Sequence, residues 1–183
     1  MTPDIGTRLA TISMALRQVV IPALPPNEVL AIEQATLCVG HLGVLSEQYN
    51  YLADYETLCL AEMAGLGQQL ADAVNSSGES ASSLLSGDET RAAADALRQV
   101  LAEAGSLAAP SHTRRESRNR IASAIDDLLM ASLTDGSAGF VATSDRLVVA
   151  HGKKQTLRDR AWFQHTGMDP DRAALPSIPD LIG

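Results

Sequence analysis

The chain has 183 residues, of which 45% are hydrophobic and only 3% aromatic, so it can bury a core, and that core is aliphatic. Strand-forming runs of β-branched and aromatic residues are scarce, and we therefore expect an all-α fold. The formal net charge of −8 argues against a nucleic-acid binder and against a protein that binds anionic membranes.

The first helix is expected from about Ile5 to Ala23. Its large aliphatic residues recur in alternating steps of four and three, which places them on one face of a helix. Thr2 or Asp4 can cap its first turn. Pro22 and the prolines that follow it then end the helix.

A second, long helix, capped by Asn27, is expected to continue to about residue 75. Every third or fourth residue from Ala31 to Ala73 is apolar or weakly polar, with Glu56 as the one charged exception. A seven-residue period of this length predicts a seam that packs on its neighbours in the manner of a coiled coil. Three residues could bend this helix or divide it in two: Gly40, Gly43 and Asn50.

Two shorter helices are predicted after this one. The serine-rich residues 75–88 indicate a mobile connector, and Asp88 is expected to cap a third helix that ends near Leu107. A fourth helix is expected from Ser111 or Thr113 to about residue 135. Residues 1–136 would thus form an antiparallel bundle of the four-helix type with one long helix.

Residues 137–183 are predicted to form a partly irregular C-terminal extension. A helical turn up to Gly152 and a short basic helix from Lys153 to His165 precede a proline-spaced tail. We expect the tail to dock on the bundle or on a partner, because it carries large aliphatic residues. The aromatic pair Trp162 and Phe163 either anchors an interface or plugs one end of the bundle. The candidate interface anchors are Trp162, Phe163, Leu175, Ile178 and Leu181.

Glu56 has two interpretations. A buried carboxylate is costly unless it is paired, so this residue could be an interior polar site that binds a ligand or transfers a proton. The other interpretation, which we favour, is that the seam leaves the core near Glu56 or changes phase at Asn50.

Four arginines crowd the start of the predicted fourth helix, where the helix dipole already places positive charge. Guanidinium groups at a helix start are suited to bind phosphate, carboxylate or an acidic partner. Alternatively, they form ion pairs with the acidic second helix and hold the bundle together. The four are Arg114, Arg115, Arg118 and Arg120. A second basic group could extend the same face: Lys153, Lys154, Arg158 and Arg160.

No metal or cofactor site is predicted. None of the four histidines has a glutamate three residues before it, as carboxylate-bridged metal bundles require. Gly65-Leu66-Gly67 lies within a helical pattern with no preceding strand and is not a phosphate loop. Cys38 and Cys59 are expected to be reduced and buried, and the chain shows no signal peptide or long uncharged apolar run, so we expect a cytoplasmic protein without membrane contact.

The segment Leu16-Arg17-Gln18-Val19-Val20-Ile21-Pro22-Ala23-Leu24-Pro25, followed by an amphipathic helix, resembles one known family over about residues 8–72. The family consists of small helical accessory subunits of aminoglycoside-phosphotransferase-type kinases in hydroxyacyl-CoA catabolism. The resemblance implies a non-catalytic subunit and transfers no catalytic residue. The serine-rich connector and the last ~45 residues depart from the family's pattern.

Taken together, these features predict a non-catalytic helical subunit that assembles with itself or with a larger enzyme, such as the kinase named above. The alternative is a bundle that binds or transforms an acyl or phosphate-bearing ligand, for example a coenzyme A derivative, between Glu56 and the arginine cluster.

Overall fold

The computed structural model of the protein describes residues 4–76, 87–106, 108–166 and 169–182. These residues form helices and their connections, with no strand among them, which confirms the predicted all-α class. The chain divides into two compact units: unit 1 comprises Met1–Leu52 and Leu157–Gly183, and unit 2 comprises Ala53–Thr156. The predicted boundary between residues 136 and 137 falls inside unit 2.

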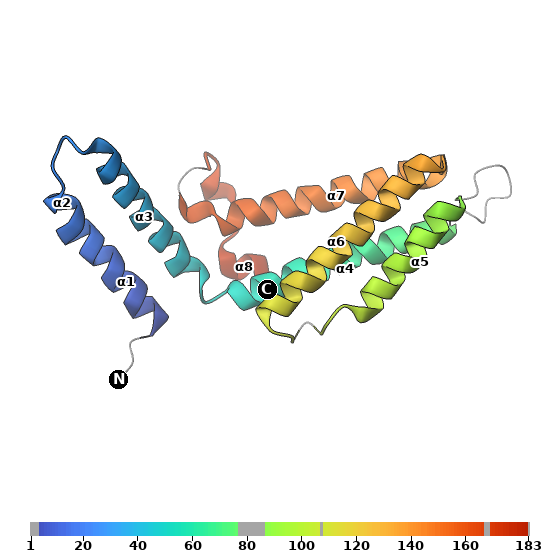
Figure 1. The fold of residues 1–183 in the computed structure, drawn as a ribbon, viewed down its shortest axis with the longest axis horizontal. Coiled ribbons are helices and arrows are strands. Elements are labelled where there is room, and N and C mark those ends of the chain that lie inside the picture. Colours follow the sequence, from blue (N-terminus) through green and yellow to red (C-terminus); the bar gives the residue numbers. More distant parts are fainter. Residues whose placement is uncertain (1–3, 77–86, 107, 167–168, 183) are drawn as a thin grey trace. The chain divides into compact units, whose positions relative to one another are not determined.

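Unit 1 begins with a hairpin of two helical arms (Figure 1). The first arm starts as predicted, with the Asp4 carboxylate accepting a hydrogen bond of 2.7 Å from the Thr7 backbone N–H. It contains a π-helical segment that sequence periodicity did not predict. The second arm is not capped by Asn27, since Glu28 occupies the cap position and makes no capping side-chain hydrogen bond. The elements are α1 (Ile5–Ala15), η1 (Leu16–Val20), α2 (Ile21–Ala23) and α3 (Val29–Gln48).

The C-terminal residues complete unit 1 and fold onto their own chain. Gln48 of α3 donates a hydrogen bond of 2.7 Å to the carbonyl oxygen of Trp162, and Ile178 of the tail is buried. The tail was expected to be irregular, but it also contains a short helix. This helix can form because Pro179 lies in its first turn, where a missing N–H costs nothing. The elements are η2 (Gln164–Thr166), η3 (Arg172–Ala174) and α8 (Ile178–Ile182).

The described residues of unit 2 form four helices, two of which, α5 and α6, pack as an antiparallel hairpin (Figure 1). Its core is aliphatic except for one phenylalanine from α7. The helices are α4 (Leu52–Ser76), α5 (Asp88–Glu103), α6 (Ser111–Thr134) and α7 (Ala138–Trp162), of which α7 continues into unit 1 beyond Thr156. The core residues are Leu60, Leu66, Leu70, Ala71, Ala73, Val74, Ala94, Leu97, Ile121, Ile125, Leu128 and Phe140.

The predicted long helix is two helices, divided at the turn around Asn50, which was one of the expected break points. The seam is correct in α4, where most of its members are buried. It is out of phase in α3, where the buried residues are Val39, Val44 and Gln48. Cys38 is therefore exposed, contrary to expectation, whereas Cys59 is buried as predicted. The predicted connector, residues 75–88, lies mostly outside the described residues.

Two other expectations need correction. The third helix ends at Glu103 rather than near Leu107. The segment after Gly136 is not a turn followed by a short helix but the single 25-residue helix α7. Its glycines and polar residues gave no helical periodicity, yet Phe140 fills the core of unit 2 and Trp162 is buried in unit 1.

Candidate functional sites

Glu56 is buried within unit 2, and it faces two of the predicted arginines. Its Oε1 lies 2.6 Å from Nη2 of Arg115, and its Oε2 lies 3.9 Å from Nη2 of Arg114. Burial alone would raise the pKa of the Glu56 carboxyl. Hydrogen bonds from Arg115 and Ser111 and the charge of both arginines outweigh burial, so the pKa lies below its usual range.

Arg114 is itself buried, with only 7% of its surface exposed. Its guanidinium donates hydrogen bonds to the carbonyl oxygens of Ala53, at 3.0 Å, and Ala109, at 2.5 Å, and to the hydroxyl of Ser111, at 3.2 Å. It therefore ties the start of α6 to the start of α4. A buried charge that is so surrounded by acceptors serves as a structural joint between the two helices.

The remaining predicted arginines lie on the surface. Arg120 forms an ion pair of 2.6 Å with Glu103 of α5, and Arg118 is half-buried and forms no ion pair among the described residues. Three of the four arginines thus meet carboxylates of the same chain, which is the arrangement expected if they hold the bundle together. In the second basic group, Arg160 contacts Asp169 through two hydrogen bonds of 2.7 and 3.0 Å.

The predicted aromatic anchors have different surroundings. Trp162 is buried in unit 1, whereas Phe163 is 50% exposed. In the tail, Ile178 is buried and Leu175 and Leu181 are half-buried. Trp162 therefore acts as an internal plug, and Phe163 is the member of the pair that is available to a partner.

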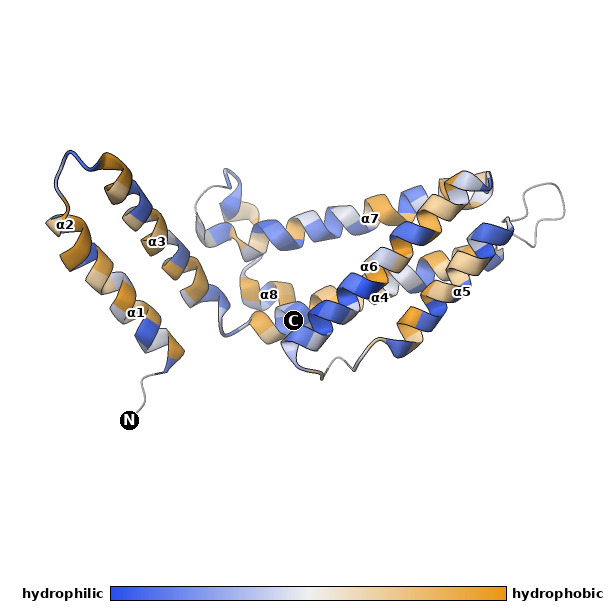
Figure 2. Cartoon of the chain, viewed as in Figure 1, coloured by the Kyte–Doolittle hydropathy of each residue, from blue (hydrophilic) through white to orange (hydrophobic). Residues whose placement is uncertain are grey.

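The hairpin of unit 1 carries a dense set of exposed large hydrophobic residues, which we call the hairpin surface. Figure 2 shows this apolar character along α1, α2 and α3. The exposed fraction reaches 64% at Val19 and 69% at Leu30. The hairpin surface comprises Ile5, Ile12, Met14, Val19, Val20, Val29, Leu30, Leu37 and Leu45.

Helix α3 is the one helix among the described residues that is long and apolar enough, by length and composition, to cross a membrane. A signal sequence or a core helix of a soluble protein can meet the same criteria. Only 6% of the apolar window is buried, so α3 is not a core helix within the chain. Val39, Val44 and Gln48 are the buried residues of α3, so most of its apolar side chains are not covered within the described part of the chain.

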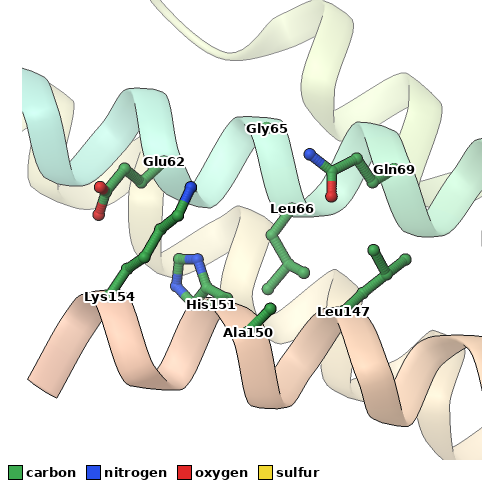
Figure 3. A pocket seen from close by; sticks show the side chains of 8 residues that line it. All are labelled: Glu62, Gly65, Leu66, Gln69, Leu147, Ala150, His151 and Lys154. Carbon is green, nitrogen blue, oxygen red and sulfur yellow. The ribbon is translucent and has the colours of Figure 1, made fainter.

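A pocket of about 220 Å³ lies between α4 and α7 in unit 2; we call it the α4–α7 pocket (Figure 3). Four polar side chains and an apolar wall line it. Figure 3 shows Lys154 reaching from α7 towards α4 at the Glu62 end of the pocket. The lining residues are Glu62, Gly65, Leu66, Gln69, Leu147, Ala150, His151 and Lys154.

Most of the residues that line this pocket were missed at the level of sequence. Lys154 was singled out as part of a basic face, whereas, as candidate site residues, Gly65 and Leu66 were considered only as a phosphate loop and His151 only as a metal ligand, and both possibilities were rejected. The available signal was the pair His151 and Lys154, which are three residues apart and share a helix face. Recognising it required α7 to be predicted as one continuous helix. Among the described residues, no group of three or more potential metal ligands occurs.

Comparison of the chain with models of protein families, with curated proteins and with solved structures finds no match. The candidate sites therefore have to be interpreted from their own chemistry.

Proposed function

We propose that the protein is a non-catalytic helical subunit that assembles through its hairpin surface, with a second copy of the chain as the first partner. The observation that carries this proposal is the exposure of nine large hydrophobic residues in one hairpin. Burying one such side chain fully is worth about 1.5–3 kcal/mol, so covering even part of this surface favours association.

The charge of the hairpin supports contact between identical copies. Residues 4–52 contain four acidic side chains (Asp4, Glu28, Glu33 and Glu47) and two basic ones (Arg8 and Arg17), a net charge of −2. The other residues carry most of the chain's charge of −8. Two hairpins can therefore approach with little repulsion, and depletion of charged residues is typical of the core of an interface.

A bilayer is a poorer partner for this surface. Glu33 and Glu47 lie within α3, and Arg17 lies within the facing arm. A charged residue costs about 2.5–3.5 kcal/mol at the centre of a membrane helix on insertion scales, and less towards the ends, where Glu33 and Glu47 lie, so each adds a fraction of that cost. A protein surface can instead leave these charges at its solvated rim.

We also place the protein in the cytoplasm, because Cys38 is an exposed thiol that an oxidising compartment would modify. An accessory role beside a hydroxyacyl-CoA kinase rests on the resemblance of residues 8–72 alone. A kinase would be a second partner, bound in addition to the homo-oligomer.

The mass of the full chain in solution tests the proposal. Size-exclusion chromatography with light scattering should give a dimer or a larger oligomer at micromolar concentration. The double variant Leu30→Gln, Leu37→Gln should shift the mass towards that of one chain. The matched control is Met130→Gln, Leu133→Gln, which replaces two exposed residues of α6 and should leave the mass unchanged. A wild-type monomer across the whole concentration range, or hairpin-dependent sedimentation with lipid vesicles, would overturn the proposal.

A further inference from the structure

Helices α6 and α7, which are consecutive in unit 2, line a groove of about 390 Å³ that we call the α6–α7 groove. Most of its lining is aliphatic and comes from both helices. These residues are Leu129, Leu133, Val141, Val148 and Val149. The remaining lining residues are Ser132, Ser144 and Asp145. A groove of this composition is suited to apolar side chains that enter between two helices.

The exposed large hydrophobic residues of unit 2 are concentrated at this groove. Among the described residues of the unit there are four, and all of them lie in the second half of α6 or in α7. Leu133, Val148 and Val149 line the groove, and Met130 lies one helical turn before Leu133. Apolar residues scattered singly are normal on a protein surface, whereas a group of them marks an interaction site.

The two serines of the groove have their hydroxyl groups occupied within their own helices. Ser132 donates a hydrogen bond of 2.7 Å to the carbonyl oxygen of Leu129, and Ser144 donates one of 3.0 Å to the carbonyl oxygen of Val141. Both serines are almost completely buried. Their small side chains leave room above them, and their hydroxyl protons are already used. The groove therefore favours aliphatic groups over polar ones.

The charges beside the groove are acidic. Asp145 lines it and is exposed, and Asp126 lies one helical turn before Leu129 on the same face of α6. Neither aspartate forms an ion pair among the residues that the structure describes. Both carboxylates are therefore available to a cationic partner.

The one basic residue in this stretch does not offset these charges at the groove. Arg146 donates to its own helix, at 3.2 Å to the carbonyl oxygen of Ala142 and at 3.4 Å to the hydroxyl of Thr143. Residues 121–150 contain four aspartates, at positions 126, 127, 135 and 145, and this one arginine, a net charge of −3. The surroundings of the groove are thus negative as a whole.

We infer that the α6–α7 groove binds a basic amphipathic helix of a partner protein. The lined stretch of α7, from Val141 to Val149, is about 12 Å long at ~1.5 Å per residue, which is about two helical turns. This length accepts two or three apolar side chains spaced as i, i+3 or i+4, and i+7. Lysine or arginine side chains next to that apolar stripe would reach Asp145 and Asp126.

Charge decides against two other occupants. A second copy of the chain carries a net charge of −8, and an anionic phospholipid surface is negative as well, so the acidic surroundings of the groove repel both. The groove belongs to unit 2 and the hairpin surface to unit 1, so this inference does not rest on self-assembly.

The test is fluorescence anisotropy on the full chain with two labelled helical peptides of about 14 residues. The lysine peptide carries leucine at every third or fourth position, lysine beside this stripe and alanine elsewhere, and the glutamate peptide has glutamate in place of lysine. The lysine peptide should bind with a Kd of about 10–100 µM, and the glutamate peptide about tenfold or more weakly. Equal binding of the two peptides, or no binding of the lysine peptide at about 1 mM, would overturn the inference.

Two matched pairs of variants locate the site. Leu133→Gln, Val149→Gln should weaken binding of the lysine peptide about tenfold or more, whereas Leu30→Gln, Leu37→Gln on the hairpin surface should not. Asp145→Lys should reduce the preference for the lysine peptide about tenfold, whereas Glu33→Lys, which changes the net charge equally but lies in α3, should not.

Far-UV circular dichroism confirms that each of these variants is folded. Unchanged affinity in Leu133→Gln, Val149→Gln would show that the peptide binds elsewhere and would overturn the inference. Light scattering of the same variant gives the second check. A lower oligomer mass than that of the wild type would show that a second copy occupies the groove, which would also overturn the inference.

Discussion

The carboxylate of Asp135, in the turn between α6 and α7, caps α5 by accepting hydrogen bonds from Thr90. The backbone N–H of Thr90 lies 2.9 Å from Oδ2, and its hydroxyl lies 2.9 and 2.8 Å from the two carboxylate oxygens. Thr90 is completely buried. The Ser137 hydroxyl donates a further hydrogen bond of 2.6 Å to Asp135. A helix start usually takes its cap from the residue just before it, but this one takes it from 45 residues away.

Replacing Asp135 with alanine should lower the free energy of unfolding by about 1–3 kcal/mol, because it leaves the buried backbone N–H of Thr90 without its acceptor. Urea titration followed by circular dichroism would measure this change. Asp127→Ala removes an exposed carboxylate from α6, the helix that precedes Asp135, and should have little effect. Equal losses in the two variants would contradict the assignment of Asp135 as a cap.

The same residue predicts a pH dependence. Burial alone would raise the pKa of Asp135, but the hydrogen bonds from Ser137 and Thr90 outweigh it, so its pKa lies below the ordinary value of 3.8. A lowered pKa contributes stability that is fully present above the ordinary pKa and is lost as the pH falls through the lowered one. The urea midpoint of the wild type should therefore fall more than that of Asp135→Ala between about pH 5 and pH 2.

Gly87 should be sensitive to the smallest substitution. A Cβ atom at this position would overlap the Asp135 carboxylate, although the backbone of Gly87 is one that alanine can adopt. Gly87→Ala should therefore destabilise the protein for a steric reason alone. Gly152→Ala places the same methyl group in open space within α7 and should stabilise the protein by about 0.5–1 kcal/mol. Thermal unfolding of the two variants should show shifts of opposite sign.

Replacing Glu56 should lower the free energy of unfolding far more than replacing a surface carboxylate that has an equally short ion pair. Glu56→Gln removes the charge that faces the buried Arg114 and should cost about 1–3 kcal/mol, moderated by the carbonyl acceptors that Arg114 keeps. Glu103→Gln breaks the exposed pair with Arg120 and should leave the urea midpoint nearly unchanged. A comparable loss of stability in both variants would show that the burial of Glu56 adds nothing to the strength of its ion pair.

The parts of the fold that were predictable are those set by local pattern. The first arm of the hairpin, the extent of α6 and the break near Asn50 follow from apolar spacing, prolines and glycines. Glu56 was found because it interrupts a regular seam. Its arginine partners were recognised as a cluster, and pairing with α4 was one of the two interpretations offered.

The parts that were not predictable depend on partners distant in sequence. The face that α3 buries is set by its contacts with the first arm and the C-terminal residues, so Val39 and Val44 replace the expected seam. The cap of α5 comes from Asp135, and no local spacing indicates this. The α4–α7 pocket needs two helices to meet, one of which has too many polar residues and glycines to show a period.

The last prediction concerns a second hydrogen bond that caps a helix from a distant part of the chain. The Gln48 amide of α3 donates to the carbonyl oxygen of Trp162 at the end of α7, where helix carbonyls lack partners within the helix. Gln48→Met keeps the length of the side chain but loses this buried hydrogen bond, which should cost unit 1 about 0.5–1.5 kcal/mol.

Trp162 is the single tryptophan of the chain, so its fluorescence reports on unit 1 alone. Gln48→Met should shift the urea midpoint seen by fluorescence and leave that of the α4–α7 helices, the larger part of the circular dichroism signal, close to the wild type. Equal shifts by both methods would mean that the two units unfold as one cooperative structure, because only then would a bond confined to unit 1 stabilise the helices of unit 2.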